Sequence, residues 1–154
     1  MIVVGYQGVG KSTLAKNWVN AIDLESSHFW INGRRDPEWY IPYCSIAESL
    51  SKQGFVVCVS SHEVVRKQLQ GSEERKAIVC PSPHLQDEWI AKLEARWNET
   101  GLDKDWKALA NAMDRYADNV AELLSEGGFE KVVIMDMDYN LGDLLGMVIQ
   151  NEDR

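Results

Sequence analysis

The residues with the clearest chemistry lie near the start of the chain, in Gly5-Tyr6-Gln7-Gly8-Val9-Gly10-Lys11-Ser12-Thr13. They match the spacing Gly-x4-Gly-Lys-Ser, which is the P-loop motif that binds the phosphates of a nucleotide. Glycines let backbone N–H groups approach phosphate oxygens without a Cβ in the way. Lys11 would place its charge against the β- and γ-phosphates, and the Ser12 hydroxyl would bind Mg²⁺. The alternative is a glycine-rich turn that only caps a helix.

The flanking residues supply the elements that this motif needs. Residues 1–4 are apolar and predict a short buried strand, and Leu14, Trp18 and Ile22 recur at helical spacing after Lys11. A helix that begins at Lys11 adds a partial positive charge of about half a unit at its N-terminus. The residues expected to contact the phosphates are Gly5, Gln7, Gly8, Val9, Gly10, Lys11, Ser12 and Thr13.

Short apolar segments alternate with helical patterns along the rest of the chain. Further strands are expected at residues 21–24, 55–59, 77–80 and 131–136. Helices are expected at residues 42–52, 63–69, 85–98, 103–125 and 141–149. This alternation predicts an α/β fold with a parallel sheet covered on both faces. The longest helix has a stripe expected to face the core, made of Trp106, Leu109, Met113, Tyr116, Val120 and Leu123.

Length and charge limit the classes of protein that the chain can belong to. Its 154 residues fit one domain, residues 1–154, and no apolar run approaches the roughly 20 residues of a membrane helix. The net charge is −8, with +1 in residues 1–77 and −9 in residues 78–154, which argues against nucleic acid as the main partner.

An apolar strand at residue 1 leaves no room for a leader, so a cytoplasmic location is expected. Cys44, Cys58 and Cys80 have no metal-binding spacing and are expected to be buried free thiols.

The P-loop and the order of elements resemble the small P-loop kinases, such as adenylate, thymidylate, shikimate and dephospho-CoA kinases and short kinase-like proteins of bacteriophages. This resemblance implies a three-layer P-loop fold with five mostly parallel strands in the order 2-3-1-4-5. It also implies an acceptor site beside the second strand and a mobile lid after the fourth, at about residues 82–102. ATP and Mg²⁺ would be the cofactors.

The resemblance assigns roles to residues on the acceptor side. Asp23 ends the second strand, where similar kinases place an acid that binds the acceptor hydroxyl or Mg²⁺. Glu25 lies close enough to share this work. Arg34, Arg35 and Arg66 are candidates for binding the acceptor, because guanidinium groups match phosphate and carboxylate geometry. The alternatives are a turn cap for Asp23 and solvated surface positions for the three arginines.

In the lid, Arg96 and Lys92 are four residues apart, and similar kinases use lid arginines to neutralise the transferred phosphoryl group. Arg96 is the stronger candidate. A surface ion pair between Glu88 and Lys92 is the alternative.

Two features depart from the kinase pattern. No carboxylate follows the third strand, which continues into Ser60-Ser61-His62, and the lid lacks paired arginines. His62 is expected to make local hydrogen bonds at the start of a helix. Asp136 would lie near the adenine if the strand order is that of the kinases, and near the metal if it is not.

The leading hypothesis is an ATP- and Mg²⁺-dependent kinase that acts on a small acceptor, a nucleotide or a nucleoside. Lys11, Asp23 and Arg96 would be its catalytic residues, and Ser12 and Asp23 its metal ligands. The second hypothesis is a nucleotide-binding or slowly ATP-hydrolysing module that acts through a protein partner. A GTPase is disfavoured, because neither Asp-x-x-Gly after the third strand nor Asn-Lys-x-Asp is present. Acceptor identity and oligomeric state stay open.

Overall fold

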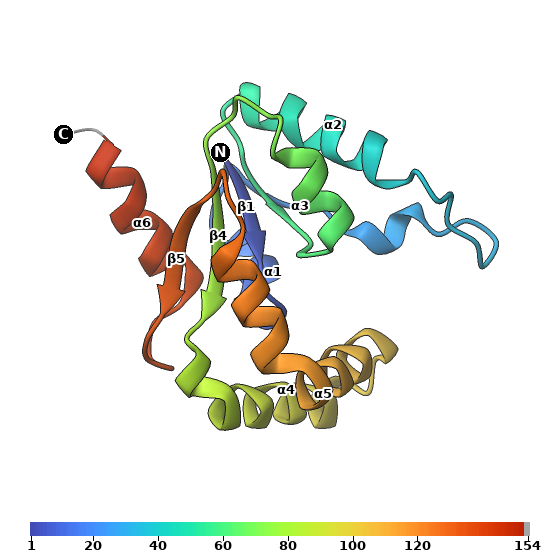
Figure 1. Ribbon diagram of the computed structural model, residues 1–154, viewed down its shortest axis with the longest axis vertical. Helices are drawn as coiled ribbons and strands as arrows, with labels where there is room; N and C mark the ends of the chain where they lie inside the picture. Colours follow the sequence, from blue (N-terminus) through green and yellow to red (C-terminus); the bar gives the residue numbers. More distant parts are fainter. Residues whose placement is uncertain (153–154) are drawn as a thin grey trace.

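The computed structural model describes residues 1–152, which form one five-stranded sheet between two layers of helices (Figure 1). The strand order is β2-β3-β1-β4-β5, and all four pairings are parallel, as predicted. The strands are β1 (Ile2–Gly5), β2 (Ala21–Asp23), β3 (Val56–Val59), β4 (Lys76–Pro81) and β5 (Glu130–Ile134). Since the strands run in one direction, their carboxyl ends meet at a single edge of the sheet, where ligands bind in such folds.

Residues 1–152 also form six α-helices and two short 3₁₀ helices, of which all but the last connect the strands. They are α1 (Lys11–Asn17), η1 (Ser26–Phe29), α2 (Tyr40–Lys52), α3 (Glu63–Leu69), η2 (Pro83–Leu85), α4 (Gln86–Thr100), α5 (Asp103–Ser125) and α6 (Leu141–Glu152). With right-handed crossovers, α1 lies on one face of the sheet, where it contacts α6, and α2, α3 and the end of α5 lie on the other. None of the helices in the described range is both long and apolar enough to cross a bilayer.

The core lies on the three central strands. Every residue of β1 and β3 is buried, as is β4 beyond Lys76, because helices cover both faces and leave no side of these strands to water. Cys44, Cys58 and Cys80 are buried free thiols, as expected. Burial raises the pKa of all three, to about 12 for Cys44 and Cys58 and about 11 for Cys80.

The predicted stripe on α5 is partly wrong. Leu109, Tyr116, Val120 and Leu123 are buried, but Trp106 and Met113 are exposed. The reason is a kink at Arg115, where φ is −134° and ψ is 19°. Before the kink, α5 leaves the sheet and runs beside α4, so that its buried positions are set by that helix (Figure 1).

Most predicted elements differ from the structure only at their ends. Helices α3 and α5 have the predicted bounds, whereas β5 ends at Ile134, so that Asp136 lies in the following turn. The segment at residues 25–39, here called the arm, contains η1 and an isolated bridge between Ile31 and Arg34. In Figure 1 the arm extends away from the sheet beside the start of α2.

Candidate functional site

The P-loop connects β1 to α1 in a conformation that requires glycine. Gly8 and Gly10 have φ angles of 87° and 103°, in the left-handed region that other residues rarely adopt. A Cβ on Gly5 would lie 2.8 Å from Val9 Cγ2 and 2.9 Å from Lys11 Cδ, which is too close for either. Gly10 then accepts the first hydrogen bond of α1, from the Leu14 N–H. The loop is therefore a cradle of backbone at a helix N-terminus, and this arrangement fits the phosphates of ATP.

Lys11 lies inside this cradle. Its Nζ donates a hydrogen bond to the carbonyl oxygen of Gly5, at 3.1 Å. Burial lowers the pKa of Lys11, and the nearby carboxylate of Asp23 partly opposes that effect. A buried ammonium without full compensation favours an anion as its partner. The position of Lys11 thus suits a bound phosphate.

Two contacts fasten the P-loop to α4 and α5. Trp89 of α4, which is fully buried, donates from Nε1 to the carbonyl oxygen of Gln7 at 2.9 Å. The side chain of Gln7 donates to Ala108 O at 3.0 Å and to Asn111 Oδ1 at 2.9 Å. Gln7 could therefore reach a phosphate only through its backbone. The sequence places Trp89 on a helical face, but nothing in it indicates the bond to the P-loop.

Asp23 lies at the carboxyl end of β2, beside Cys58 of the neighbouring strand. Burial raises the pKa of Asp23, Lys11 lowers it, and Glu25 raises it further. No backbone N–H of the described residues donates to this carboxylate, so Asp23 does not cap a turn here. Tyr43 braces the strand end, since its hydroxyl donates to Leu24 O at 2.6 Å and accepts from Ser60 N at 2.9 Å. A carboxylate is thus held in electrostatic contact with the P-loop lysine.

The arm presents its two arginines differently. Asn32 and Gly33 both have positive φ angles and turn the chain between Ile31 and Arg34. The guanidinium of Arg35 lies between two indoles, 4.0 Å from the ring centroid of Trp39 and 5.0 Å from that of Trp30. Both arginines line a cavity of about 860 Å³, together with Phe29, Ile31, Trp39 and Ile41 among others.

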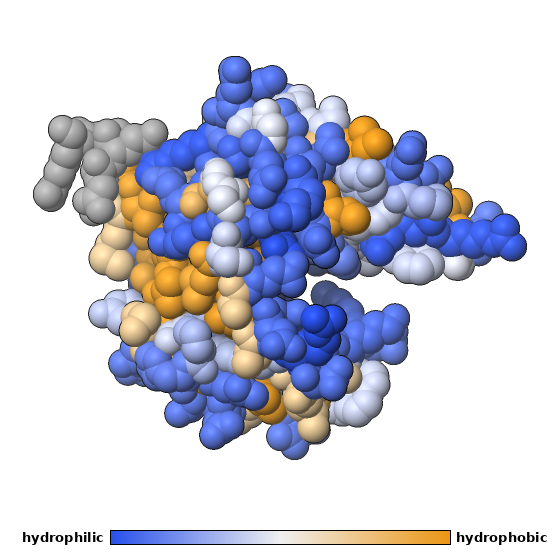
Figure 2. Space-filling view, in the orientation of Figure 1, coloured by the Kyte–Doolittle hydropathy of each residue, from blue (hydrophilic) through white to orange (hydrophobic). Residues whose placement is uncertain are grey.

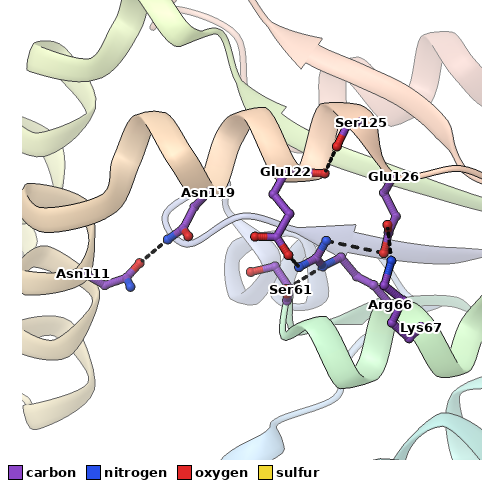
Figure 3. Close-up of polar contacts among 8 residues, drawn as sticks. All are labelled: Ser61, Arg66, Lys67, Asn111, Asn119, Glu122, Ser125 and Glu126. Atoms are coloured by element: carbon purple, nitrogen blue, oxygen red, sulfur yellow. Dashed lines mark hydrogen bonds and ion pairs between the residues drawn. The ribbon is translucent and has the colours of Figure 1, made fainter.

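Arg66 of α3 is buried and points toward the carboxylates of Glu122 and Glu126 (Figure 3). Its Nη2 lies 2.7 Å from Glu122 Oε1, its Nη1 lies 3.4 Å from Glu126 Oε1, and its Nε donates to Ser61 O. Lys67 pairs with the other oxygen of Glu126 at 2.9 Å. The guanidinium proposed for acceptor binding is therefore engaged by Glu122 of α5 and by Glu126, which directly follows this helix, and the role of Arg66 stays a prediction.

Arg96 and Lys92 lie on α4 near the P-loop. Arg96 is close enough to Lys11 to lower its pKa, and it contacts Asp105 with 3.0 Å between Nε and Oδ1. Lys92 lies over the ring of Trp89, with Nζ 4.3 Å from the centroid. Within the part of the chain that the structure describes, Lys92 makes no ion pair with Glu88, so the surface ladder is not formed.

The remaining candidates have local contacts. His62 Nδ1 lies 2.8 Å from Ser60 Oγ, as expected for a histidine that precedes a helix. Asp136 accepts a hydrogen bond from Asp138 N at 2.9 Å. It follows the edge strand β5, and β4 lies between β5 and β1.

Residues 1–152 contain no cluster of three His, Cys, Asp or Glu side chains able to hold a metal. Mg²⁺ needs only one or two protein ligands when phosphate oxygens and water supply the rest. The assignment of Ser12 and Asp23 as these ligands stays a prediction.

A hollow separates the arm from the lobe formed by α4 and the start of α5. Figure 2 shows this hollow, with mostly hydrophilic residues around it. Lys11, Asp23 and Arg96 come from three separate elements, and the pKa of Lys11 responds to both of the other residues.

Comparison with known proteins gives a likeness among solved structures. No protein-family model matches the chain, and no curated protein matches it. Among solved structures, it is similar to shikimate kinase from Bacteroides thetaiotaomicron, with a TM-score of 0.50 and 13% sequence identity. The match covers 99% of this chain and 95% of that one. At this identity the likeness shows the fold, which is the α/β fold of the small P-loop kinases.

Proposed function

We propose that this protein is a kinase that transfers the γ-phosphoryl group of ATP to a small acceptor, a nucleotide or a nucleoside. The observation that carries this proposal is the conformation of the P-loop, in which Gly8 and Gly10 have positive φ angles and Lys11 Nζ donates to Gly5 O at the start of α1. The charges of Asp23 and Arg96 both affect the pKa of Lys11, which supports placing these two side chains with it in the site. Phosphoryl transfer needs little covalent chemistry from a protein and depends on positioning and on neutralising charge. That set of side chains provides both.

Each residue then has a distinct role. The P-loop amides and Lys11 hold the phosphates, and Arg96 neutralises charge on the transferred group. Mg²⁺, held by Ser12 and Asp23, would neutralise the charge that develops between the β- and γ-phosphates. Asp23 orients the acceptor hydroxyl and accepts its proton as the new P–O bond forms and the bond to the β-phosphate oxygen breaks. Burial raises the pKa of Asp23, which brings it closer to the pKa that suits a general base.

The acceptor would enter from the arm. Arg34 and Arg35 line its cavity with aromatic side chains, and this combination suits a molecule with a flat ring and an anionic group. The likeness to a shikimate kinase supports a small-molecule acceptor in general. The preference for a nucleotide or nucleoside rests on the aromatic lining.

The test is acceptor-dependent release of ADP from Mg·ATP, measured with a panel of nucleosides, nucleotides and small hydroxy acids. At least one acceptor should stimulate release, and Lys11→Ala should abolish it while the melting temperature shows an intact fold. Lys16→Ala is the matched control, because Lys16 lies in the last turn of the same helix. Full activity in Lys11→Ala would rule the proposal out.

A nucleotide-binding module that acts through a protein partner is the second candidate. Two observations favour it: Arg66 is held by Glu122 and Glu126, and His62 rather than a carboxylate follows β3. In the same assay this candidate predicts ADP release that no acceptor changes, or no release at all.

A further inference from the structure

Arg96 is held by one contact at one end of its guanidinium. Its side chain is 41% exposed, and Nε lies 3.0 Å from Asp105 Oδ1. The two terminal nitrogens, Nη1 and Nη2, have no carboxylate partner among residues 1–152. Arg96 nevertheless lies near enough to Lys11 and Lys92 to lower the pKa of both. Three cations are therefore gathered here, with two guanidinium nitrogens left to bind an anion.

Asp105 is itself unusually well fixed for a carboxylate. Its side chain is 5% exposed, in the first turn of α5. While Oδ1 contacts Arg96, Oδ2 accepts a hydrogen bond from the Thr100 hydroxyl. Thr100 Oγ1 in turn accepts from Leu102 N, within the tight turn where Gly101 ends α4. Both carboxylate oxygens of Asp105 thus have a partner, and the hydrogen bond to Thr100 fixes the side chain to the turn between α4 and α5.

We propose that Asp105 is a positioning residue, which holds Arg96 by Nε and so directs the two terminal amino groups of the guanidinium to the transferred phosphoryl group. This inference rests on the proposed function. The physical reason is the freedom of a long side chain: an exposed arginine loses rotamer entropy when it binds, and a partner that holds it in advance reduces that loss. Because Asp105 holds the Nε edge of the guanidinium against α5, the terminal amino groups stay free to contact an anion.

A double-mutant cycle tests this inference. Asp105→Asn keeps the shape of the side chain and an acceptor for Thr100, but it removes the charge that holds Arg96. We expect the kcat of acceptor-dependent phosphoryl transfer to fall by roughly 10- to 100-fold, as for a misplaced catalytic group, with the KM for ATP little changed. In an Arg96→Ala background, Asp105→Asn should cause no further fall in kcat. A purely structural role for Asp105 predicts losses that multiply.

Asp103→Asn is the matched control. Asp103 lies in the same turn of α5, but it is exposed and pairs with the exposed Lys107, at 2.9 Å. Both changes remove one carboxylate from the N-terminus of α5, so the helix dipole is affected alike. The control variant should keep the kcat of the unmodified protein. An unchanged kcat in Asp105→Asn, beside a lowered kcat in Arg96→Ala, would overturn the inference and leave the proposed function standing.

A binding measurement covers the case in which no acceptor in the panel is phosphorylated. The ratio of affinities for a non-hydrolysable ATP analogue and for ADP reports contacts to the γ-phosphate. Arg96→Ala and Asp105→Asn should lower this ratio by the same factor. A ratio unchanged by Asp105→Asn alone overturns the positioning role, and a ratio unchanged by both variants overturns the role of Arg96 as well.

Discussion

The pKa of His62 depends on the charged groups around the site, although the proposed chemistry does not use this residue. Burial lowers its pKa, and the charges of Arg35, Lys11 and Arg66 lower it further. These three cations belong to the arm, the P-loop and α3. The pKa of the imidazole is therefore sensitive to the charges of all three segments. Because the folded state binds the proton of His62 less tightly than the unfolded state, stability falls as the pH drops through about 6.5.

A phosphate-bearing acceptor should raise the pKa of His62, because its negative charge offsets that of the neighbouring cations. Titration of the imidazole by NMR, with and without a nucleoside monophosphate, measures the change. The nucleoside without its phosphate is the control and should leave the pKa almost where it was. A pKa that falls when the monophosphate binds would contradict the placement of an anion here.

At the scale of elements, α4 is held closely to the rest of the molecule. The resemblance to the kinases predicts a mobile lid at residues 82–102, but Trp89 and Leu93 are almost fully buried and Tyr116 donates to Ser82 O at 2.8 Å. The P-loop carbonyl of Gln7 is one of the anchors. Any opening of this lobe would therefore have to break contacts with the phosphate-binding loop itself.

Trp89→Phe should weaken both the fold and the site. It removes the hydrogen bond to Gln7 O and leaves that carbonyl without its partner, which costs about 1 kcal/mol in the free energy of unfolding. Chemical denaturation measures this loss, and calorimetric titration should show weaker ATP binding, because the P-loop is less well held. Trp97→Phe is the control, since Trp97 is only partly buried and its indole N–H has no such bond in the described structure.

The contact between α3 and α5 should contribute strongly to stability. Among the described residues, Arg66→Ala leaves the carboxylate of Glu126, which is 6% exposed, with Lys67 as its one remaining partner, and breaking a buried ion pair in this way costs about 3 kcal/mol. Arg66 lowers the pKa of Glu122 by hydrogen bonding, so its contribution is present above the ordinary pKa of about 4.5 and is lost as the pH falls.

Denaturant unfolding at pH 7 and at pH 4 measures both effects. The unmodified protein should lose more stability on acidification than Arg66→Ala does. Lys107→Ala, which breaks the exposed pair with Asp103, should change the free energy of unfolding very little. Equal losses in the free energy of unfolding for Arg66→Ala and Lys107→Ala would contradict a stabilising role for the contacts of Arg66 with Glu122 and Glu126.

At the scale of the whole molecule, the sheet brings the carboxyl ends of β1 and β2 to the same edge, with β3 between them, and a hollow separates the arm from the α4–α5 lobe (Figure 2). A ligand in that hollow would contact parts that are distant in the chain. Its binding should therefore stabilise the folded state as a whole.

Mg·ATP at about 100 times its dissociation constant should raise the free energy of unfolding by about 2.7 kcal/mol. For a chain of this size, that corresponds to an increase of roughly 5–10 °C in melting temperature. Differential scanning fluorimetry would detect the shift, and Lys11→Ala should reduce it strongly. An identical shift in that variant would place the nucleotide elsewhere on the molecule.

The sequence alone determined the features that depend on neighbouring residues. The spacing from Gly5 to Ser12 predicts a phosphate cradle because the loop is built from consecutive backbone, and alternating apolar strands and helices predict the parallel sheet. The tertiary structure decided which charged side chains meet. Arg66 with Glu122 and Arg35 with Trp39 are pairs that the sequence does not reveal, because their contacts depend on how elements pack. The kink at Arg115 likewise exposed Met113, which the helical period alone would bury.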